Sequence, residues 1–307
     1  MRLLDVRCSV KSVAATAAIV TCLVVTAGQL AAAPRPTGPS GPDLLGNPTR
    51  VETALDAGSG AAVLAREGKT RDALGFPVGV KRVGKHVRDG FEQVEYDEVT
   101  ETDFAGRVTA VTQFDTKGRL RAAVRLDSPP RGGLKVTLDG AVRSAQRSAL
   151  AAGLTVETPS TSDADQAAGG WTIHWARVQD GVPVRGDETR VQVWPDGRIQ
   201  SVAHIEHDLA AATQRIGLAG ARQVASSNLD RWFASRNSGY TIQSLSLEWV
   251  EPNAAFDPTR TTSAAAPYRL AWVADVKPTG DAANYMWLIT LFVDAADGTI
   301  IGGDFVE

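Results

Sequence analysis

Alternation of apolar and polar residues predicts short β-strands through most of the chain. Between residues 119 and 126, Leu120, Ala122 and Val124 alternate with Arg119, Arg121 and Arg125, which is typical of a strand with one buried face. The same pattern predicts strands at 91–99, 107–114, 154–157, 171–178, 187–194, 198–206, 244–249, 268–276, 285–294 and 299–304. Glycine-containing turn sequences separate most of them, so the strands form antiparallel meanders.

A helical period predicts two longer helices, at 139–152 and 218–235. Gly153 stands where a C-terminal cap is expected. The second helix carries one apolar stripe: Leu218, Ala221, Ala225, Leu229 and Trp232. Weaker helical patterns occur at 50–56 and 60–66. The order of a helix followed by a meander occurs twice, so we predict an α+β fold of two helix-plus-antiparallel-meander units behind an N-terminal β-rich region.

The chain of 307 residues divides into five predicted ranges. Arg2, Arg7 and Lys11 precede an apolar run at 13–25 and a small-residue exit, so residues 1–33 are typical of a secretory signal peptide, with a retained anchor as the alternative. A Pro/Gly-rich leader follows at 34–48, and the β-rich region at 49–130. The break Ser-Pro-Pro-Arg-Gly-Gly at 128–133 precedes the two units, at 134–208 and 215–307. We expect residues 133–307 to fold on their own.

Composition and motifs argue against an enzyme. Both cysteines, Cys8 and Cys22, lie in the signal segment, so thiol chemistry is excluded after cleavage. The net charge of −3 argues against a nucleic acid partner. The nearest approach to a zinc-protease motif, His204-Ile205-Glu206-His207, lacks the required helical spacing, and no Gly-x-Ser-x-Gly sequence occurs. We therefore predict no catalytic, cofactor-binding or metal-binding residue, with a dispersed constellation as the alternative.

Seven tryptophans provide the candidate aromatic binding surface. Most fall at inward positions of the alternation, which favours core packing over a stacking platform. Trp194 is the exception, because the alternation directs it outward. We therefore select Trp194 as a candidate partner-binding residue.

Two stretches carry a family resemblance. The sequence Asp-Gly-Val-Pro-Val-Arg-Gly-Asp at 180–187, followed by Asp-Gly-Arg-Ile at 196–199, resembles the fungalysin/thermolysin propeptide and related PepSY-like repeats. The sequences at 268–273 and 292–301 resemble a PepSY domain, and Trp175 in the first unit corresponds to Trp272 in the second. The resemblance covers about residues 138–307 and implies tandem units with no protease domain. In such precursors these domains assist and inhibit a zinc protease.

The resemblance implies an exported, non-catalytic protein that is secreted or cell-wall associated, with no stable membrane span after signal cleavage. Its expected partner is an extracellular protein such as a secreted metalloprotease, which it would inhibit or help to fold, or a cell-envelope protein. The alternative is a structural or ligand-binding module of the cell envelope. At the C-terminus, Gly302 and Gly303 are expected to form a flexible pair, and Phe305 and Val306 are candidates for filling apolar subsites of the partner. The terminal carboxylate or Glu307 itself is a candidate oxygen ligand to the partner's zinc. The alternative is that this segment finishes the last strand with Phe305 in the core.

Overall fold

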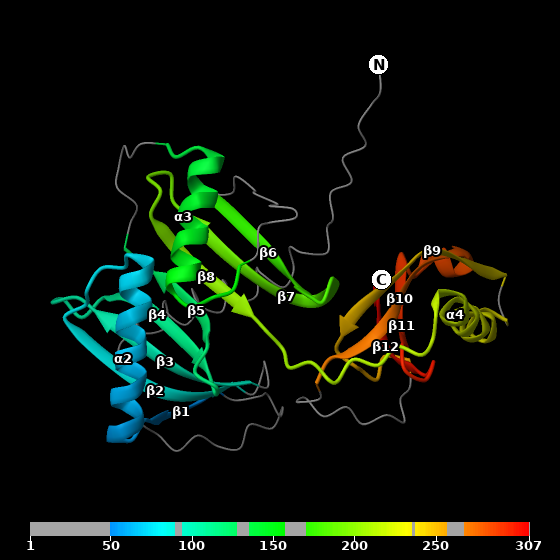
Figure 1. The fold of residues 1–307 in the computed structure, drawn as a ribbon, viewed down its shortest axis with the longest axis horizontal. Helices are drawn as coiled ribbons and strands as arrows, with labels where there is room; N and C mark the ends of the chain where they lie inside the picture. Colours follow the sequence, from blue (N-terminus) through cyan, green and yellow to red (C-terminus); the bar gives the residue numbers. More distant parts are fainter. Residues whose placement is uncertain are drawn as a thin grey trace. The chain divides into compact units, whose positions relative to one another are not determined.

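The computed structural model describes residues 50–89, 94–127, 135–156, 170–234, 237–256 and 267–306. The predicted signal peptide, the leader, the break at 128–133 and Glu307 lie outside these residues. Within them, three α-helices are interleaved with twelve strands that pair mostly in the antiparallel sense, which confirms the α+β fold (Figure 1). Among the described residues, no helix is long and apolar enough to cross a bilayer.

The elements follow the chain in this order: β1 (Arg50–Ala54), α2 (Ala57–Leu74), β2 (Lys81–Asp89), β3 (Val94–Thr102), β4 (Val108–Asp115), β5 (Leu120–Arg125), α3 (Leu138–Ala151), β6 (Trp171–Gln179), β7 (Val182–Val193), β8 (Ile199–Ile205), α4 (Leu218–Phe233), β9 (Ser238–Val250), β10 (Arg269–Gly280), the short 3₁₀ helix η2 (Asp281–Asn284), β11 (Leu288–Asp294) and β12 (Ile300–Val306).

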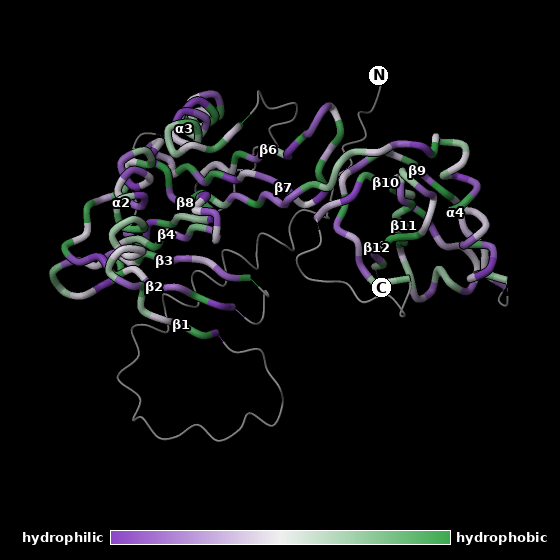
Figure 2. Tube along the Cα trace, turned by 60° about the horizontal axis from the view of Figure 1, so that its bottom comes forward, coloured by the Kyte–Doolittle hydropathy of each residue, from purple (hydrophilic) through white to green (hydrophobic). Residues whose placement is uncertain are grey.

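The chain forms two compact units. The first comprises Met1–Trp175 with Thr189–His204, and the second comprises Ala176–Glu188 with Ile205–Glu307. Hydrophobic and hydrophilic positions alternate along the strands of each unit, as expected for strands with one core-facing side (Figure 2).

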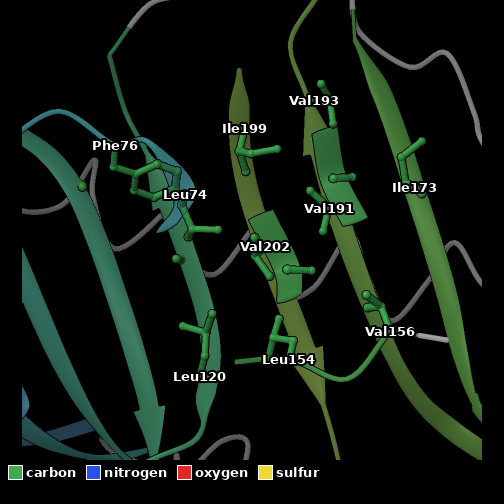
Figure 3. Packing of buried hydrophobic residues seen from close by; sticks show 14 of the residues in the cluster. Leu74, Phe76, Leu120, Leu154, Val156, Ile173, Val191, Val193, Ile199 and Val202 are labelled. Atoms are coloured by element: carbon green, nitrogen blue, oxygen red, sulfur yellow. The ribbon is translucent and has the colours of Figure 1, made fainter. Parts of the chain in front are cut away.

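In the first unit, the strands follow the order β1-β2-β3-β4-β5-β8-β7, with β6 paired to β7. Helices α2 and α3 lie on the same side of this sheet (Figure 1). One core joins them: it includes Val63 and Leu74 of α2, Ala145 of α3, Phe114 of β4 and Val202 of β8. Figure 3 shows part of this packing. The core therefore draws on both sides of the break at 128–133, and the compact units divide the chain differently from the ranges predicted from sequence.

The N-terminal region differs from the prediction in its first elements. Residues 50–54 form the strand β1, which pairs with β2, so the helix expected at 50–56 is wrong. The weak helix at 60–66 is the middle of a longer helix, α2, which Asp56 caps by accepting a hydrogen bond from the Ser59 N–H. Of the buried positions of α2, Glu67 and Thr70 are polar, which explains why its apolar stripe is weak in the sequence.

The last hairpin of each meander has a similar turn, which is one residue longer in the third hairpin than in the first two. In each hairpin, the last residue before the turn donates its backbone N–H to the carbonyl of the first residue after the turn, at 2.8–2.9 Å. The donors are Asp115, Trp194 and Asp294. A glycine with positive φ precedes the acceptor residue in all three: Gly118, Gly197 and Gly298. The N-terminal region therefore ends in a hairpin similar to those of the two predicted units, and it also contains a helix and a meander.

In the second unit, β9, β10, β11 and β12 form an antiparallel sheet in sequence order. The buried face of α4 packs on this sheet: Ala221, Ala225 and Leu229 share a core with Val276 and Leu291. The tip of the β6–β7 hairpin also belongs to this unit, and its strand β7 pairs with β9 in parallel at Val184 and Trp249. Strand β12 lies at the end of the strand order.

Candidate functional site

A surface pocket of about 320 Å³ lies beside α4 in the second unit. The residues that line it all have apolar side chains: Trp232, Phe233, Ala255, Phe256, Ala282, Met286 and Ile289. We call this the aromatic pocket. A concave site of this size with apolar walls fits one large apolar side chain of a ligand or partner.

The aromatic pocket is built by segments that lie far apart in the sequence. Trp232 and Phe233 end α4, and Ile289 comes from β11. The Trp232 and Phe256 rings stack with their centroids 4.7 Å apart and their planes 16° from parallel. Trp232 nevertheless remains 38% exposed.

Phe305 extends the apolar surface next to the aromatic pocket. It pairs directly with Ile289 across β11 and β12, so both side chains lie on the same face of the sheet. Two residues earlier on that face, Gly303 lies under Phe256: a Cβ atom at Gly303 would come within 2.9 Å of two atoms of the Phe256 ring. The pocket wall and Phe305 are therefore neighbours along β12, and Phe305 is 51% exposed.

Asn253 covers part of the outer edge of β12. Its side chain accepts a hydrogen bond from the Gly303 N–H at 3.0 Å and donates one to the Gly303 carbonyl at 2.9 Å. Its backbone N–H donates to the Ile301 carbonyl at 3.0 Å. A covered edge cannot template another strand along this stretch. An approaching partner therefore meets side chains here, and chiefly those of the aromatic pocket and Phe305.

The structure contradicts the orientation expected for Trp194. The residue follows β7 and occupies the turn, where strand alternation no longer applies, and it is only 6% exposed. The guanidinium groups of Arg125 and Arg198 each lie 4.9 Å from its ring centroid. The aromatic ring of Trp194 is therefore not exposed to a partner. Its role in partner binding stays a prediction that the burial of the ring does not favour.

The C-terminal candidates give a mixed outcome. The segment forms strand β12 as far as Val306, as the alternative interpretation expected, but Phe305 is exposed and does not enter the core. Gly302 and Gly303 are not a flexible pair, because both pack tightly: a Cβ at Gly302 would lie 2.6 Å from Asn253 Oδ1. Glu307 lies outside the described residues.

A second pocket of about 310 Å³ in the same unit is polar and contains His207. His207 Nδ1 donates to Asp187, whose carboxylate is fully buried and also accepts from the His207 N–H and from Arg177 Nη1, both at 2.9 Å. The imidazole stacks on Tyr268 with ring centroids 4.4 Å apart. Burial, reinforced by the charge of Glu251, raises the pKa of the Tyr268 hydroxyl, which therefore stays neutral.

This arrangement fixes the His207 ring, so that Nε2 remains as its second hydrogen-bonding atom. His204, three residues earlier, instead contacts Thr189 Oγ1 at 2.9 Å. The two histidines of the sequence His204-Ile205-Glu206-His207 thus serve different partners. Within the described ranges, no group of three or more His, Cys, Asp or Glu side chains is arranged to hold a metal ion. The absence of a metal site stays a prediction.

Sequence reasoning missed two further features. The aromatic pocket has no motif, because its walls come from α4, the segment near Phe256 and β11. The pair of buried carboxyl groups Glu67 and Glu101 was also missed, although a glutamate within the weak apolar stripe of α2 was a possible signal.

These features describe an α+β protein in which helices cover antiparallel meanders, with an apolar pocket on one unit. No family model matches the chain, and no curated protein matches it. Among solved structures, the chain is similar to the Bacillus megaterium YpeB C-terminal domain, with 12% identity, a TM-score of 0.38, and coverage of 79% of this chain and 96% of that chain. At this TM-score the similarity carries no information about the role of any residue, and the PepSY-like character stays a prediction.

Proposed function

We propose that this chain is an exported, non-catalytic protein that binds another extracellular protein through the aromatic pocket and Phe305. The observation that carries the proposal is the exposure of Trp232 and Phe305 beside a preformed apolar pocket. Exposed aromatic residues around a pocket are the features that dominate binding energy at protein interfaces. Trp232, stacked on Phe256, is already held in place, so little side-chain entropy is lost on binding.

The finer proposal is that the partner is a secreted metalloprotease, which this chain inhibits or helps to fold. It rests on the sequence resemblance to protease propeptides at residues 180–199 and 268–301. The pocket supports it in one respect: an apolar cavity with an adjacent phenylalanine suits the exchange of apolar side chains between two proteins. Localisation outside the cell rests on the signal-like N-terminus.

Capture from culture supernatant tests the proposal. The mature chain and its Trp232→Ala and Phe305→Ala variants are immobilised, and the captured proteins are compared by mass spectrometry. Phe104→Ala is the control, since Phe104 is an aromatic residue in a turn of the first unit and, at 95%, is even more exposed than Trp232 and Phe305. We expect one protein to be captured by the wild type and the control, and to be lost from both pocket variants. Equal capture by all four proteins contradicts the proposal.

Protease activity tests the finer proposal separately. If the captured protein is a metalloprotease, we expect its peptidase activity to fall when the wild-type chain is added and to fall less with Trp232→Ala. A captured protein without peptidase activity rejects the protease role and leaves protein binding in place.

The polar pocket around His207 favours the second candidate, a ligand-binding module of the cell envelope. Its walls combine charged side chains with the apolar residues Leu209 and Trp249. A screen of peptidoglycan and teichoic-acid fragments by changes in the NMR signals of His207 tests this candidate. Saturable changes at His207 that a His207→Ala variant abolishes would support it, and their absence would reject it.

A further inference from the structure

Two carboxyl groups are buried together between helix α2 and strand β3 in the first unit. Glu67 of α2 and Glu101 of β3 are each 1% exposed. Removing a carboxylate from water disfavours its charged form, and two such groups in contact disfavour each other's ionisation further. A pair of this kind holds a proton more strongly than an isolated glutamate does.

The charged groups around the pair come from every element packed against it. Arg71 of α2 donates to Glu101 Oε1 at 3.2 Å and lies 3.9 Å from Glu67 Oε2. Arg82 of β2 donates to Glu67 Oε2 at 3.1 Å. The loop between α2 and β2 contributes the Gly79 N–H, which donates to Glu101 Oε2 at 2.6 Å.

The two carboxyl groups differ in the hydrogen bonds that they accept. Glu101 accepts hydrogen bonds on both of its oxygens. Glu67 accepts on one oxygen, and its arginine partner Arg82 is partly exposed. Burial, the hydrogen bond with Glu101 and the charge of Glu101 together raise the pKa of Glu67 to about 7. Glu67 is therefore the group of the pair that holds the proton below neutral pH.

We infer that Glu67 and Glu101 form a proton-dependent latch, which holds α2 against β3 in mild acid, weakens as the pH rises toward neutrality and is lost above it. With the proton bound, Glu67 donates a hydrogen bond to the Glu101 carboxylate. Once the proton is lost, two buried carboxylates face each other. Arg71, Arg82 and the Gly79 N–H compensate them, and Arg71 is shared with Asp72. The latch is independent of the aromatic pocket, which lies in the other unit.

The direction of the pH effect follows from linkage. The pKa of Glu67 in the folded chain lies above the ordinary glutamate value of 4.5, so the folded state binds more protons than the unfolded state between these two values. The contribution is fully present below the unfolded pKa. It declines as the pH rises and is lost above the folded pKa of about 7.

Hydrogen exchange in the full mature chain tests the latch. Protection factors of the α2 amides, corrected for intrinsic exchange, are measured between pH 5.5 and 8.5. Helix α3 is the internal control, because its buried residues are three alanines, Ala141, Ala145 and Ala149. We expect α2 protection to fall on the order of tenfold across this range, and α3 protection to fall less.

Two substitutions to glutamine separate the latch from general stability. Glu67→Gln retains the shape of the protonated form and its hydrogen bond to Glu101, so we expect α2 protection to become independent of pH in this range. Glu98→Gln is the matched control: Glu98 is a buried carboxylate of the same strand, paired with Arg50 and Lys85. We expect it to leave the pH dependence of α2 as in the wild type.

Persistence of the wild-type pH dependence in Glu67→Gln overturns the inference, as does its loss in Glu98→Gln. If Glu67→Gln fails to fold, Glu101→Gln replaces it. That variant removes the charge that repels ionised Glu67, which lowers the pKa of Glu67, so the pH at which α2 protection falls should shift downward. An unchanged midpoint in Glu101→Gln also overturns the inference.

Discussion

Trp272 donates its indole N–H to the backbone carbonyl of Ile216 at 2.8 Å, and Ile216 immediately precedes the N-cap of α4. In the first unit, Trp171 donates in the same way to Val136 at 3.0 Å, and Val136 precedes the N-cap of α3. Each tryptophan thus joins a strand of the meander to the start of the helix that covers it. The internal repetition is therefore a repetition of contacts as well as of element order.

The same two residues are held from a second side. The N–H of Val136 donates to the carbonyl of Pro195, and the N–H of Ile216 donates to that of Ala295; both acceptors lie in the last hairpin turn of their repeat. Strand, turn and helix start are therefore fixed together in each repeat.

Loss of the indole hydrogen bond should destabilise the second unit. We expect Trp272→Phe to lower the free energy of unfolding by about 1–2 kcal/mol, because the Ile216 carbonyl loses its donor while the apolar ring is largely retained. Urea denaturation followed by hydrogen exchange in α4 measures the change. The control is Trp287→Phe, which concerns a tryptophan that is 75% exposed and should change stability by less than about 0.5 kcal/mol. Equal effects of the two substitutions would contradict the assigned role of Trp272.

The sequence predicted most elements but not their registers. Helices α3 and α4 begin within a residue of their predicted positions, because their buried faces are continuous apolar stripes. The predicted correspondence of Trp175 with Trp272 is wrong, since Trp171 makes the equivalent contact. Alternation identifies a strand, whereas the pairing of two strands depends on contacts between distant residues.

Other failures have different physical causes. Helix α2 has polar residues at two buried positions, so its periodicity is weak although its caps are strong. Residues 154–156 do not form the strand expected at 154–157, and residue 157 lies outside the described residues. Leu154 and Val156 enter the core from an irregular segment. The aromatic pocket was not predicted, because no local sequence pattern indicates that the distant residues Trp232 and Phe256 are in contact.

The environment of Trp194 predicts its response to a fluorescence quencher. Two guanidinium groups cover the ring, so acrylamide should reach Trp194 far less readily than Trp287. We expect Trp287→Phe to remove much of the quenchable emission, and Trp194→Phe to remove emission that acrylamide barely affects. Stern–Volmer measurements on the two variants and the wild type check this. Strong quenching of the component lost in Trp194→Phe would show that the ring is accessible after all.

The shared core of the first unit predicts the behaviour of fragments. A fragment of residues 133–307 loses Val99, Phe114 and Leu120 from this core, as well as the pairing of β5 with β8. Each large apolar side chain contributes about 1.5–3 kcal/mol, so the combined loss is comparable to the whole stability of a domain. We therefore expect α3 and β6–β8 to lose protection from hydrogen exchange in this fragment.

The second unit provides the control within the same fragment, since α4 and β9–β12 keep their own core and should stay protected. A fragment of residues 49–208 should retain cooperative unfolding of α2 and α3. Full protection of α3 in the fragment of residues 133–307 would show that the earlier expectation of independent folding was sound and that α2 is dispensable.

Gly303 links the integrity of the aromatic pocket to strand β12. A Cβ atom at this position would lie 2.1 Å from the Thr290 carbonyl oxygen and 2.3 Å from Cε2 of Phe256. The carbonyl belongs to the backbone of β11 and cannot move without disturbing the sheet. We expect Gly303→Ala to destabilise the second unit by about 1–3 kcal/mol, as overpacking commonly does, and to displace Phe256 from Trp232.

Thermal unfolding measures the first effect, and the second appears as increased acrylamide quenching of Trp232, assigned by comparison with Trp232→Phe. Gly60→Ala is the matched control. Gly60 lies in α2, where the nearest atom to an added Cβ is 3.7 Å away, so alanine should be neutral or stabilising by up to about 1 kcal/mol. If Gly303→Ala were as stable as Gly60→Ala, the close approach of Phe256 to β12 would be wrong, and with it the placement of Phe305 beside the aromatic pocket.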